Sequence, residues 1–177
     1  MKQTLSNPIW FLTLTMVGAM LLPSNVHASS RTPGKVIAGW VEKTTILPWG
    51  VEVPSKLDTG ALTSSIFAEE IERFRKDDER WVRFVLVLED TDDEVQRIPV
   101  EVPLARSVRI KDHDDPSSRR AVVELELCFD GRKHVTEFSL ADRSQFIYPV
   151  LLGRRFMEDV AIVDPSETFL TQAHCAD

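Results

Sequence analysis

Short runs of β-branched and aromatic residues recur along the sequence from Val36 onward, and turn residues separate them. The run from Trp81 to Leu88 is the strongest strand signal among them. In Ala121 to Phe129 apolar and polar residues alternate, and Asp130-Gly131 then indicates a hairpin turn. About eight or nine short strands and one or two short helices are predicted, which favours an all-β fold and a small closed barrel.

Two charged segments interrupt this pattern. In Glu69 to Arg80, Ile71 and Phe74 are spaced by three, so the segment fits either a helical turn or a solvated loop. Asp90 to Glu94 is predicted to be a solvated acidic turn. It lacks the glycine and the closing glutamate of a calcium loop.

The first 28 residues differ from the rest of the chain. Lys2 is their only charged residue, an apolar run extends from Ile9 to Leu22, and Pro23 and then Val26-His27-Ala28 follow. This order is typical of a secretory signal peptide cleaved after Ala28. The alternative, a membrane anchor, is disfavoured because a span needs ~20 apolar residues and this run is shorter. We therefore expect a periplasmic or secreted protein with no stable membrane span after signal removal.

The remaining chain is predicted to form one domain. Its length of 177 residues, with 43% hydrophobic and 28% charged residues, is ordinary for a globular protein. The expected organisation is a signal peptide over 1–28, a flexible leader over 29–35, the domain over 36–170 and a C-terminal tail over 171–177.

The net charge argues against a nucleic-acid partner. The full chain carries −7, and removal of Lys2 with the signal leaves about −8. An acidic protein binds polyanions poorly, so we expect no nucleic-acid role.

The two cysteines, Cys128 and Cys175, allow two interpretations. In an exported protein they could form a disulfide that closes a loop of about 47 residues and stabilises the fold by ~4 kcal/mol. Equally, Cys128 could be a buried thiol and Cys175 a free thiol in the tail.

The segment Asp58-Thr59-Gly60-Ala61 carries the residue types of a catalytic loop. The strand-like run Val51 to Leu57 leads directly into Asp58, which would act as a general acid or base. The Thr59 hydroxyl can both donate and accept hydrogen bonds, and Gly60 permits a tight loop. The competing interpretation is an ordinary surface turn, for which Asp and Gly are also common.

A basic segment from Leu104 to Arg120 is the second candidate site. It contains Arg106, Arg109 and Arg119, and arginine can hold a carboxylate through two parallel hydrogen bonds. We predict that these three arginines bind substrate on a mobile flap, together with Ala61 of the loop. An exposed hairpin with charges on its solvated face is the simpler alternative.

The sequence Asp-Thr-Gly-Ala resembles the active-site loop of retropepsin-type aspartic proteases, in which each subunit contributes one loop. Pro149 to Met157 resembles their second motif, in which two apolar residues, Gly and Arg lead into a short helix. The resemblance implies that Leu151 and Leu152 pack beneath the loop and that Gly153 lets the chain cross close by. Leu62 and Thr63 stand where acidic partners of the helix arginine are usual, so the partner of Arg154 stays open.

Most of the mature chain, roughly residues 36 to 170, is similar to a bacterial family named ATP-dependent zinc proteases and now regarded as retropepsin-like. The matching pieces are Gly39 to Val41, Lys56 to Ala61, Arg80 to Phe84, Asp142-Arg143, Pro149 to Arg154 and Val163 to Ser166. This resemblance implies a functional link to ATP-grasp ligases and a glutamyl-rich or otherwise acidic peptide substrate.

The zinc and ATP of that family name find no support in the residues. His113, His134 and His174 lie apart, there is no H-E-x-x-H motif, and the cysteines lack zinc spacing. The chain also has no phosphate-binding glycine loop. We predict no metal site and no cofactor.

One Asp loop per chain predicts a homodimer. Aspartic proteolysis needs two carboxylates that share a proton, so Asp58 from two copies should meet at a two-fold axis. The expected function is hydrolysis of peptide or protein substrates. The chief rival is a non-catalytic exported module that binds an acidic partner, and a zinc peptidase is a weaker third possibility.

Overall fold

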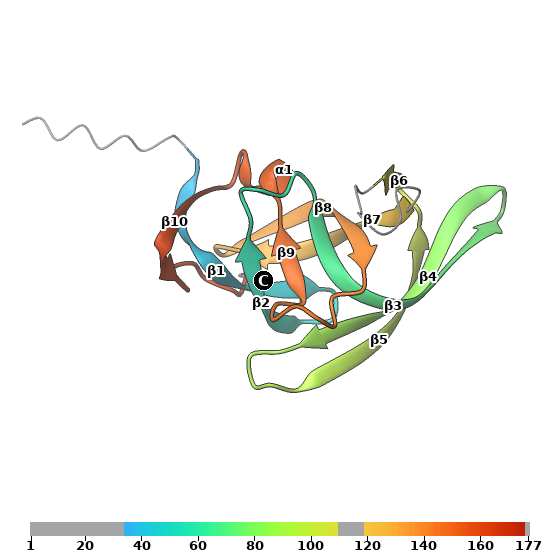
Figure 1. The fold of residues 1–177 in the computed structure, drawn as a ribbon, viewed down its shortest axis with the longest axis horizontal. Helices are drawn as coiled ribbons and strands as arrows, with labels where there is room; N and C mark the ends of the chain where they lie inside the picture. Colours follow the sequence, from blue (N-terminus) through green and yellow to red (C-terminus); the bar gives the residue numbers. More distant parts are fainter. Residues whose placement is uncertain (1–33, 110–118, 176–177) are drawn as a thin grey trace, which may run out of the picture. The chain divides into compact units, whose positions relative to one another are not determined.

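The computed structural model describes residues 34–109 and 119–175, in which ten strands and one short helix form (Figure 1). In chain order they are β1 (Val36–Leu47), β2 (Val51–Leu57), β3 (Ser64–Lys76), β4 (Glu79–Glu89), β5 (Val95–Pro103), β6 (Arg106–Arg109), β7 (Arg119–Phe129), β8 (Arg132–Ala141), β9 (Val150–Leu152), α1 (Arg154–Met157) and β10 (Ala161–Thr168).

Six of these strands close into a barrel. The order is β1, β2, β9, β3, β8 and β7, and β7 pairs back onto β1. The closing contact is antiparallel and joins Thr45 to Cys128 and Leu47 to Glu126. The prediction of an all-β closed barrel is therefore confirmed.

Alternation of side chains along the strands forms the core of the barrel. In β2 every second residue is buried, including Val51, Val53 and Leu57. Each barrel strand contributes a fully buried or nearly fully buried apolar side chain, for example Ile46, Val53, Ile66, Leu127, Phe138 and Leu152. Burial of a side chain of this size stabilises the fold by about 1.5–3 kcal/mol.

The charged segment 69–80 forms strands, so the expectation of a helical turn or loop was wrong. The first part of β3 pairs with β8 and β9, whereas its second part pairs with β4, which in turn pairs with β5. Figure 1 shows the resulting hairpins extending from the barrel. Cross-strand contacts explain the result: Phe74 lies opposite Trp81, and the Lys76 ammonium lies 4.4 Å from the centroid of the Trp81 ring.

The segment after β10 is fixed to the barrel. Cys128 and Cys175 form a disulfide with a Cα–Cα distance of 5.6 Å, which resolves the two interpretations left open by the sequence. The Thr45 hydroxyl donates a 2.8 Å hydrogen bond to the carbonyl oxygen of Ala173. The buried carboxylate of Glu42 accepts hydrogen bonds of 3.0 Å from the backbone N–H groups of Leu170 and Thr171.

Three sequence predictions fall wholly or partly outside the described residues. The signal peptide 1–28 lies entirely outside them, as do most of the leader 29–35 and the centre of the basic segment, 110–118. In the parts of the chain that are described, no helix has the length and apolar character needed to cross a membrane.

Candidate active site

Strand β2 positions Asp58 at the edge of the barrel. β2 lies between β1 and β9, and its last residue, Leu57, is in register with Leu152. The backbone N–H of Asp58 then donates a 2.9 Å hydrogen bond to the carbonyl oxygen of Leu152. Because both neighbouring strands hold β2 up to its end, the Asp58 backbone is fixed while the next two residues are exposed.

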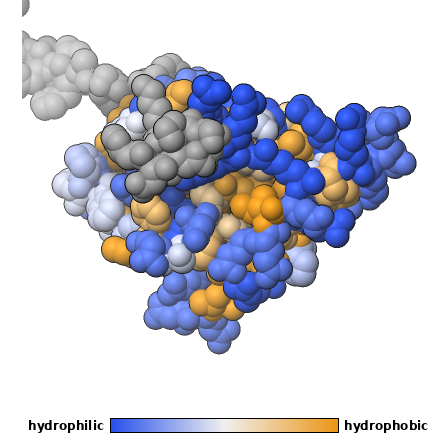
Figure 2. All heavy atoms as spheres, turned by 45° about the vertical axis from the view of Figure 1, so that its right-hand side comes forward, coloured by the Kyte–Doolittle hydropathy of each residue, from blue (hydrophilic) through white to orange (hydrophobic). Residues whose placement is uncertain are grey.

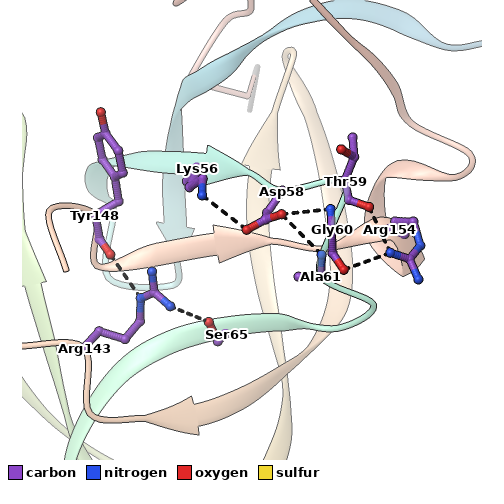
Figure 3. Close-up of polar contacts among 9 residues, drawn as sticks. All are labelled: Lys56, Asp58, Thr59, Gly60, Ala61, Ser65, Arg143, Tyr148 and Arg154. Atoms are coloured by element: carbon purple, nitrogen blue, oxygen red, sulfur yellow. Dashed lines mark hydrogen bonds and ion pairs between the residues drawn. The ribbon is translucent and has the colours of Figure 1, made fainter. Parts of the chain in front are cut away.

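The Asp58 carboxylate has donors on both oxygens (Figure 3). Oδ1 accepts hydrogen bonds from the backbone N–H groups of Gly60, at 2.9 Å, and Ala61, at 3.3 Å. Oδ2 lies 3.3 Å from the ammonium of Lys56. Burial raises the pKa of Asp58, but the Gly60 N–H and Lys56 outweigh it and hold the pKa below its ordinary value.

The loop therefore presents an ionised carboxylate at neutral pH. Its side chain is 26% exposed, so water or a peptide can reach it. A carboxylate of this kind can accept a proton from water, which is the general-base half of an aspartic protease reaction. Among the described residues, no second carboxylate contributes to the pKa of Asp58.

Arg154 holds the loop from the other side. Its Nη1 atom donates to the carbonyl oxygens of Thr59, at 2.9 Å, and Gly60, at 3.0 Å. Its backbone N–H donates to the carbonyl oxygen of Ala61 at 2.9 Å. These backbone carbonyls answer the question of a partner for Arg154, which the sequence left open because acidic residues are missing at 62 and 63.

Gly153 allows two parts of the chain to cross beneath this loop. A Cβ atom at this position would lie 2.6 Å from the backbone carbonyl carbon of Thr63, a distance that only glycine permits. The Gly153 N–H also donates a 3.1 Å hydrogen bond to the Ser64 hydroxyl oxygen. Leu152 is fully buried and Leu151 half-buried in the preceding strand, in line with the predicted packing.

The predicted substrate-binding arginines are not equivalent. Arg106 is bound bidentately to Glu137, with Nε–Oε1 and Nη2–Oε2 distances of 2.8 and 2.5 Å. This hydrogen bonding lowers the pKa of Glu137 and raises that of Arg106. Arg109 and Arg119 lie opposite each other at the far end of the β6–β7 pair.

The sequence reasoning assigned no role to Arg143, which it named with Asp142 among the pieces that match the bacterial family. The side chain is buried and donates hydrogen bonds to the carbonyl oxygen of Tyr148 and to the Ser65 hydroxyl. Its membership of that matching piece, two residues after the end of β8, was the available signal. Figure 3 shows it in the same region as Asp58.

The side chains that could bind a metal are dispersed in the described residues. No group of three or more His, Cys, Asp or Glu residues there is arranged to hold a metal ion.

Comparison with known proteins gives a consistent family assignment. A family model described as RimB-like, retropepsin-like aspartic endopeptidase RimB, matches residues 37–174. A crystal structure of a Legionella pneumophila protein of unknown function is similar, with a TM-score of 0.64 and 30% sequence identity. That similarity covers 77% of this chain and 98% of the Legionella chain.

Curated relatives carry a different name. A Shewanella pealeana protein named probable alpha-L-glutamate ligase is 33% identical over 118 residues, 66% of this chain and 25% of that protein. A Desulfotalea psychrophila protein of the same name is 31% identical over 138 residues, 77% of this chain and 30% of that protein. The chain therefore spans between 25% and 30% of the length of these two relatives.

Proposed function

Because this chain belongs to the RimB-like family of retropepsin-like aspartic endopeptidases, we propose that it is an aspartic peptidase whose catalytic pair is Asp58 from two copies. The observation that carries the proposal is the geometry of the Asp58 loop. The carboxylate lies at the end of a barrel strand, its Oδ1 is held by two loop N–H groups, and Arg154 fixes the loop backbone. A simple surface turn does not need this support from a distant helix.

The mechanism requires the two Asp58 carboxylates to share one proton, because two negative charges at ~3 Å cannot both persist. The ionised Asp58 accepts a proton from a water molecule, and the water oxygen attacks the peptide carbonyl carbon. The protonated Asp58 gives its proton to the carbonyl oxygen. Collapse of the tetrahedral intermediate breaks the C–N bond, and the amine leaves with a proton.

Exposed groups around the loop support a two-fold assembly. Thr59 and Gly60 are exposed, and the Thr59 hydroxyl has no hydrogen-bond partner within the described residues, so it is free to brace the second copy. The large apolar side chain of Leu62, which directly follows the loop, is also exposed and offers area for contact with another chain. Figure 2 shows one face on which apolar atoms lie among hydrophilic ones.

An acidic peptide is the proposed substrate. The curated relatives are named as probable glutamate ligases, and a ligase of that kind would produce glutamyl-rich chains. A peptidase related to part of such proteins could remove those residues, which would give it a functional link to an ATP-grasp ligase. Lys56 beside the catalytic carboxylate would favour a substrate with negative charge.

Export to the periplasm or outside the cell is the second part of the proposal. The order of residues in 1–28 supports it. The Cys128–Cys175 disulfide supports it independently, because disulfides persist mainly in oxidising compartments.

The test is to incubate the protein and its Asp58→Asn variant with glutamyl-rich peptides and to identify products by mass spectrometry. We expect cleavage by the unmodified protein and none by the variant, with both proteins giving the same circular dichroism spectrum. Cleavage by Asp58→Asn would contradict the mechanism. A folded protein that binds the peptides but never cleaves them would favour a non-catalytic binding module.

A further inference from the structure

Arg143 is a buried cation whose partners are all neutral. Only 6% of the residue is exposed, which is unusual for arginine. Nε donates to the carbonyl oxygen of Tyr148 at 3.1 Å, and Nη1 donates to the Ser65 hydroxyl at 2.8 Å. The guanidinium carbon also lies 4.7 Å from the centroid of the Phe146 ring.

No carboxylate makes a direct ion pair with Arg143 in the residues that the structure describes. Nη2 has no hydrogen-bond partner there, and one guanidinium nitrogen in Figure 3 carries no dashed line. Glu89 lines the same cavity as Arg143, but the hydrogen bonds that Arg143 donates go to Tyr148 and Ser65. A buried charge without a counter-ion is unfavourable, so a bound anion would stabilise this site.

The charge of Arg143 is close enough to the catalytic loop to interact with it. Burial lowers the pKa of Arg143, and the cation Arg120 lowers it further, whereas the carboxylate of Asp58 raises it. Arg143 is therefore in the electrostatic range of both a second arginine and the catalytic carboxylate. Figure 3 shows its guanidinium and Asp58 in one region of the molecule, with Tyr148 beside Arg143.

The surroundings of Arg143 fit a single side chain of a peptide. A cavity of about 120 Å³ adjoins Arg143, and its walls combine apolar side chains with the polar residues Glu89 and Ser144. They include Phe67, Val87, Phe146, Ile147 and Pro149. At about 30 Å³ per water molecule, this volume holds a few waters or one short chain of methylene groups. Apolar side chains beside the Arg143 cation suit a side chain that ends in a carboxylate, provided that this carboxylate contacts Arg143 and not Glu89.

We propose that Arg143 is a specificity-determining residue that binds a carboxylate of the substrate next to the catalytic Asp58. The inference rests on the proposed peptidase function and deepens it. Its guanidinium fork can pair with both oxygens of a carboxylate while Nε and Nη1 keep it in place. The carboxylate could belong to a glutamyl side chain or to the C-terminus of the peptide.

The test compares three peptides that differ in one group: a glutamyl peptide, its glutaminyl counterpart, and the glutamyl peptide with a C-terminal amide. For each enzyme variant the readout is a ratio of kcat/KM values between two peptides. We expect the unmodified protein to prefer the peptide that carries the recognised carboxylate. In Arg143→Gln that preference should fall about ten- to a hundredfold, as expected for a lost hydrogen bond to a charged group.

The ratio of kcat/KM values distinguishes a role of Arg143 in specificity from a purely structural role. If Arg143 only ties the 142–149 loop to β3, its loss would lower kcat/KM for all three peptides and leave the ratios unchanged, which would overturn the inference. A change in the glutamyl-to-glutaminyl ratio identifies the side chain as the source of the carboxylate. A change only with the C-terminal amide identifies the terminus.

Arg143→Lys provides the second variant, because it keeps the charge and loses the fork. The preference of Arg143→Lys for the recognised carboxylate should lie between those of the unmodified protein and Arg143→Gln. If Arg143→Gln does not fold, Arg143→Lys alone tests the inference. An unchanged preference in a folded Arg143→Lys variant would count against the inference in that case.

A binding measurement separates this inference from the proposed function. Peptide affinities are measured by calorimetry in the Asp58→Asn background, with and without Arg143→Gln. If the affinity ratio depends on Arg143 but the unmodified protein cleaves nothing, the carboxylate site stands and the peptidase proposal fails. If cleavage occurs and neither ratio depends on Arg143, the peptidase stands and the inference fails.

Discussion

The ammonium of Lys56 lies 3.3 Å from Oδ2 of Asp58, on the carboxylate oxygen that the loop N–H groups leave open. Lys56 belongs to β2 and lies two residues before Asp58, which directly follows the end of that strand. Lys56 thus stabilises the ionised form of Asp58 within a single chain. In the proposed pair, the second carboxylate has the opposite effect and favours one protonated Asp58.

Replacing Lys56 with methionine should raise the pKa of Asp58. The substitution removes a hydrogen bond and a positive charge, both of which lower that pKa. The measurement is a pH titration of the Asp58 side-chain carboxyl by ¹³C NMR. Lys43→Met is the matched control, because Lys43 pairs with Glu52 at 3.1 Å instead. An Asp58 pKa that is the same in Lys56→Met and in the unmodified protein would contradict the ion pair.

The same pKa shift determines how Asp58 affects stability with pH. Because the folded-state pKa lies below the unfolded value of about 3.9, ionised Asp58 stabilises the folded chain above that pH. This contribution is lost as the pH falls through the folded-state pKa. Asp58→Asn should therefore reduce the dependence of the unfolding free energy on pH in the acidic range, measured by urea denaturation. An identical pH dependence in both proteins would show that Asp58 is not held in its ionised form.

Replacing Arg154 with methionine should release the catalytic loop. The variant loses the Nη1 hydrogen bonds to Thr59 and Gly60 but keeps the length of the side chain. We expect kcat/KM to fall about ten- to a hundredfold, with a loss of stability of about 1 kcal/mol because the contacts are exposed.

Arg155→Met is the control for that experiment. Arg155 is the next residue of α1, but its guanidinium lies 3.6 Å from Glu137 and makes no contact with the loop carbonyls. Its replacement should have little effect on kcat/KM. Equal losses of kcat/KM in the two variants would mean that activity depends on the positive charge of α1 and not on the contact of Arg154 with the loop.

Replacing Gly153 with alanine should destabilise the fold. The new Cβ would lie 2.6 Å from the backbone of Thr63, which cannot move without displacing the start of β3. A loss of about 2–3 kcal/mol is expected from overpacking, measured by chemical denaturation. Gly50→Ala is the comparison, since Gly50 has open space around it and only a positive φ of 71°. Gly50→Ala should lower the free energy of unfolding by about 1 kcal/mol. A larger loss of stability for Gly50→Ala than for Gly153→Ala would be inconsistent with the close approach of Gly153 to Thr63.

Reduction of the Cys128–Cys175 disulfide should lower stability by about 4 kcal/mol, because the bond closes a loop between residues 47 positions apart. The measurement is urea denaturation with and without reductant. Cys175→Ser should show the lower stability in both conditions. A reductant-independent stability of the unmodified protein would indicate that the two thiols are not joined.

Local patterns in the sequence predicted much of the fold. Neighbouring residues account for the alternation in β7, the turn at Asp130-Gly131 and the strand before Asp58. The barrel was predicted from the number of short strands in the chain. The family resemblance is confirmed by the match over residues 37–174. The close crossing at Gly153 was also expected, because the motif around it carries its own geometric requirement.

Features that depend on distant partners could not be predicted. The charged part of β3 forms a strand because β4 pairs with it, and no property of 69–76 alone requires that. The partners of Arg154 are backbone carbonyls, which leave no trace in the side-chain sequence. Likewise, Arg106 of β6 forms an ion pair with Glu137 of β8. The strand register that brings these two residues together is defined only in the folded chain.

The most direct test of the shared active site mixes the unmodified protein with Asp58→Asn. The two proteins are unfolded and refolded together at a fixed total concentration, and cleavage of a glutamyl-rich peptide is measured at each mixing ratio. If each site needs Asp58 from two copies, activity should fall with the square of the unmodified fraction, to about a quarter at an equal mixture. Activity that falls in direct proportion, to about a half at that mixture, would show that one chain catalyses alone and would contradict the proposed pair.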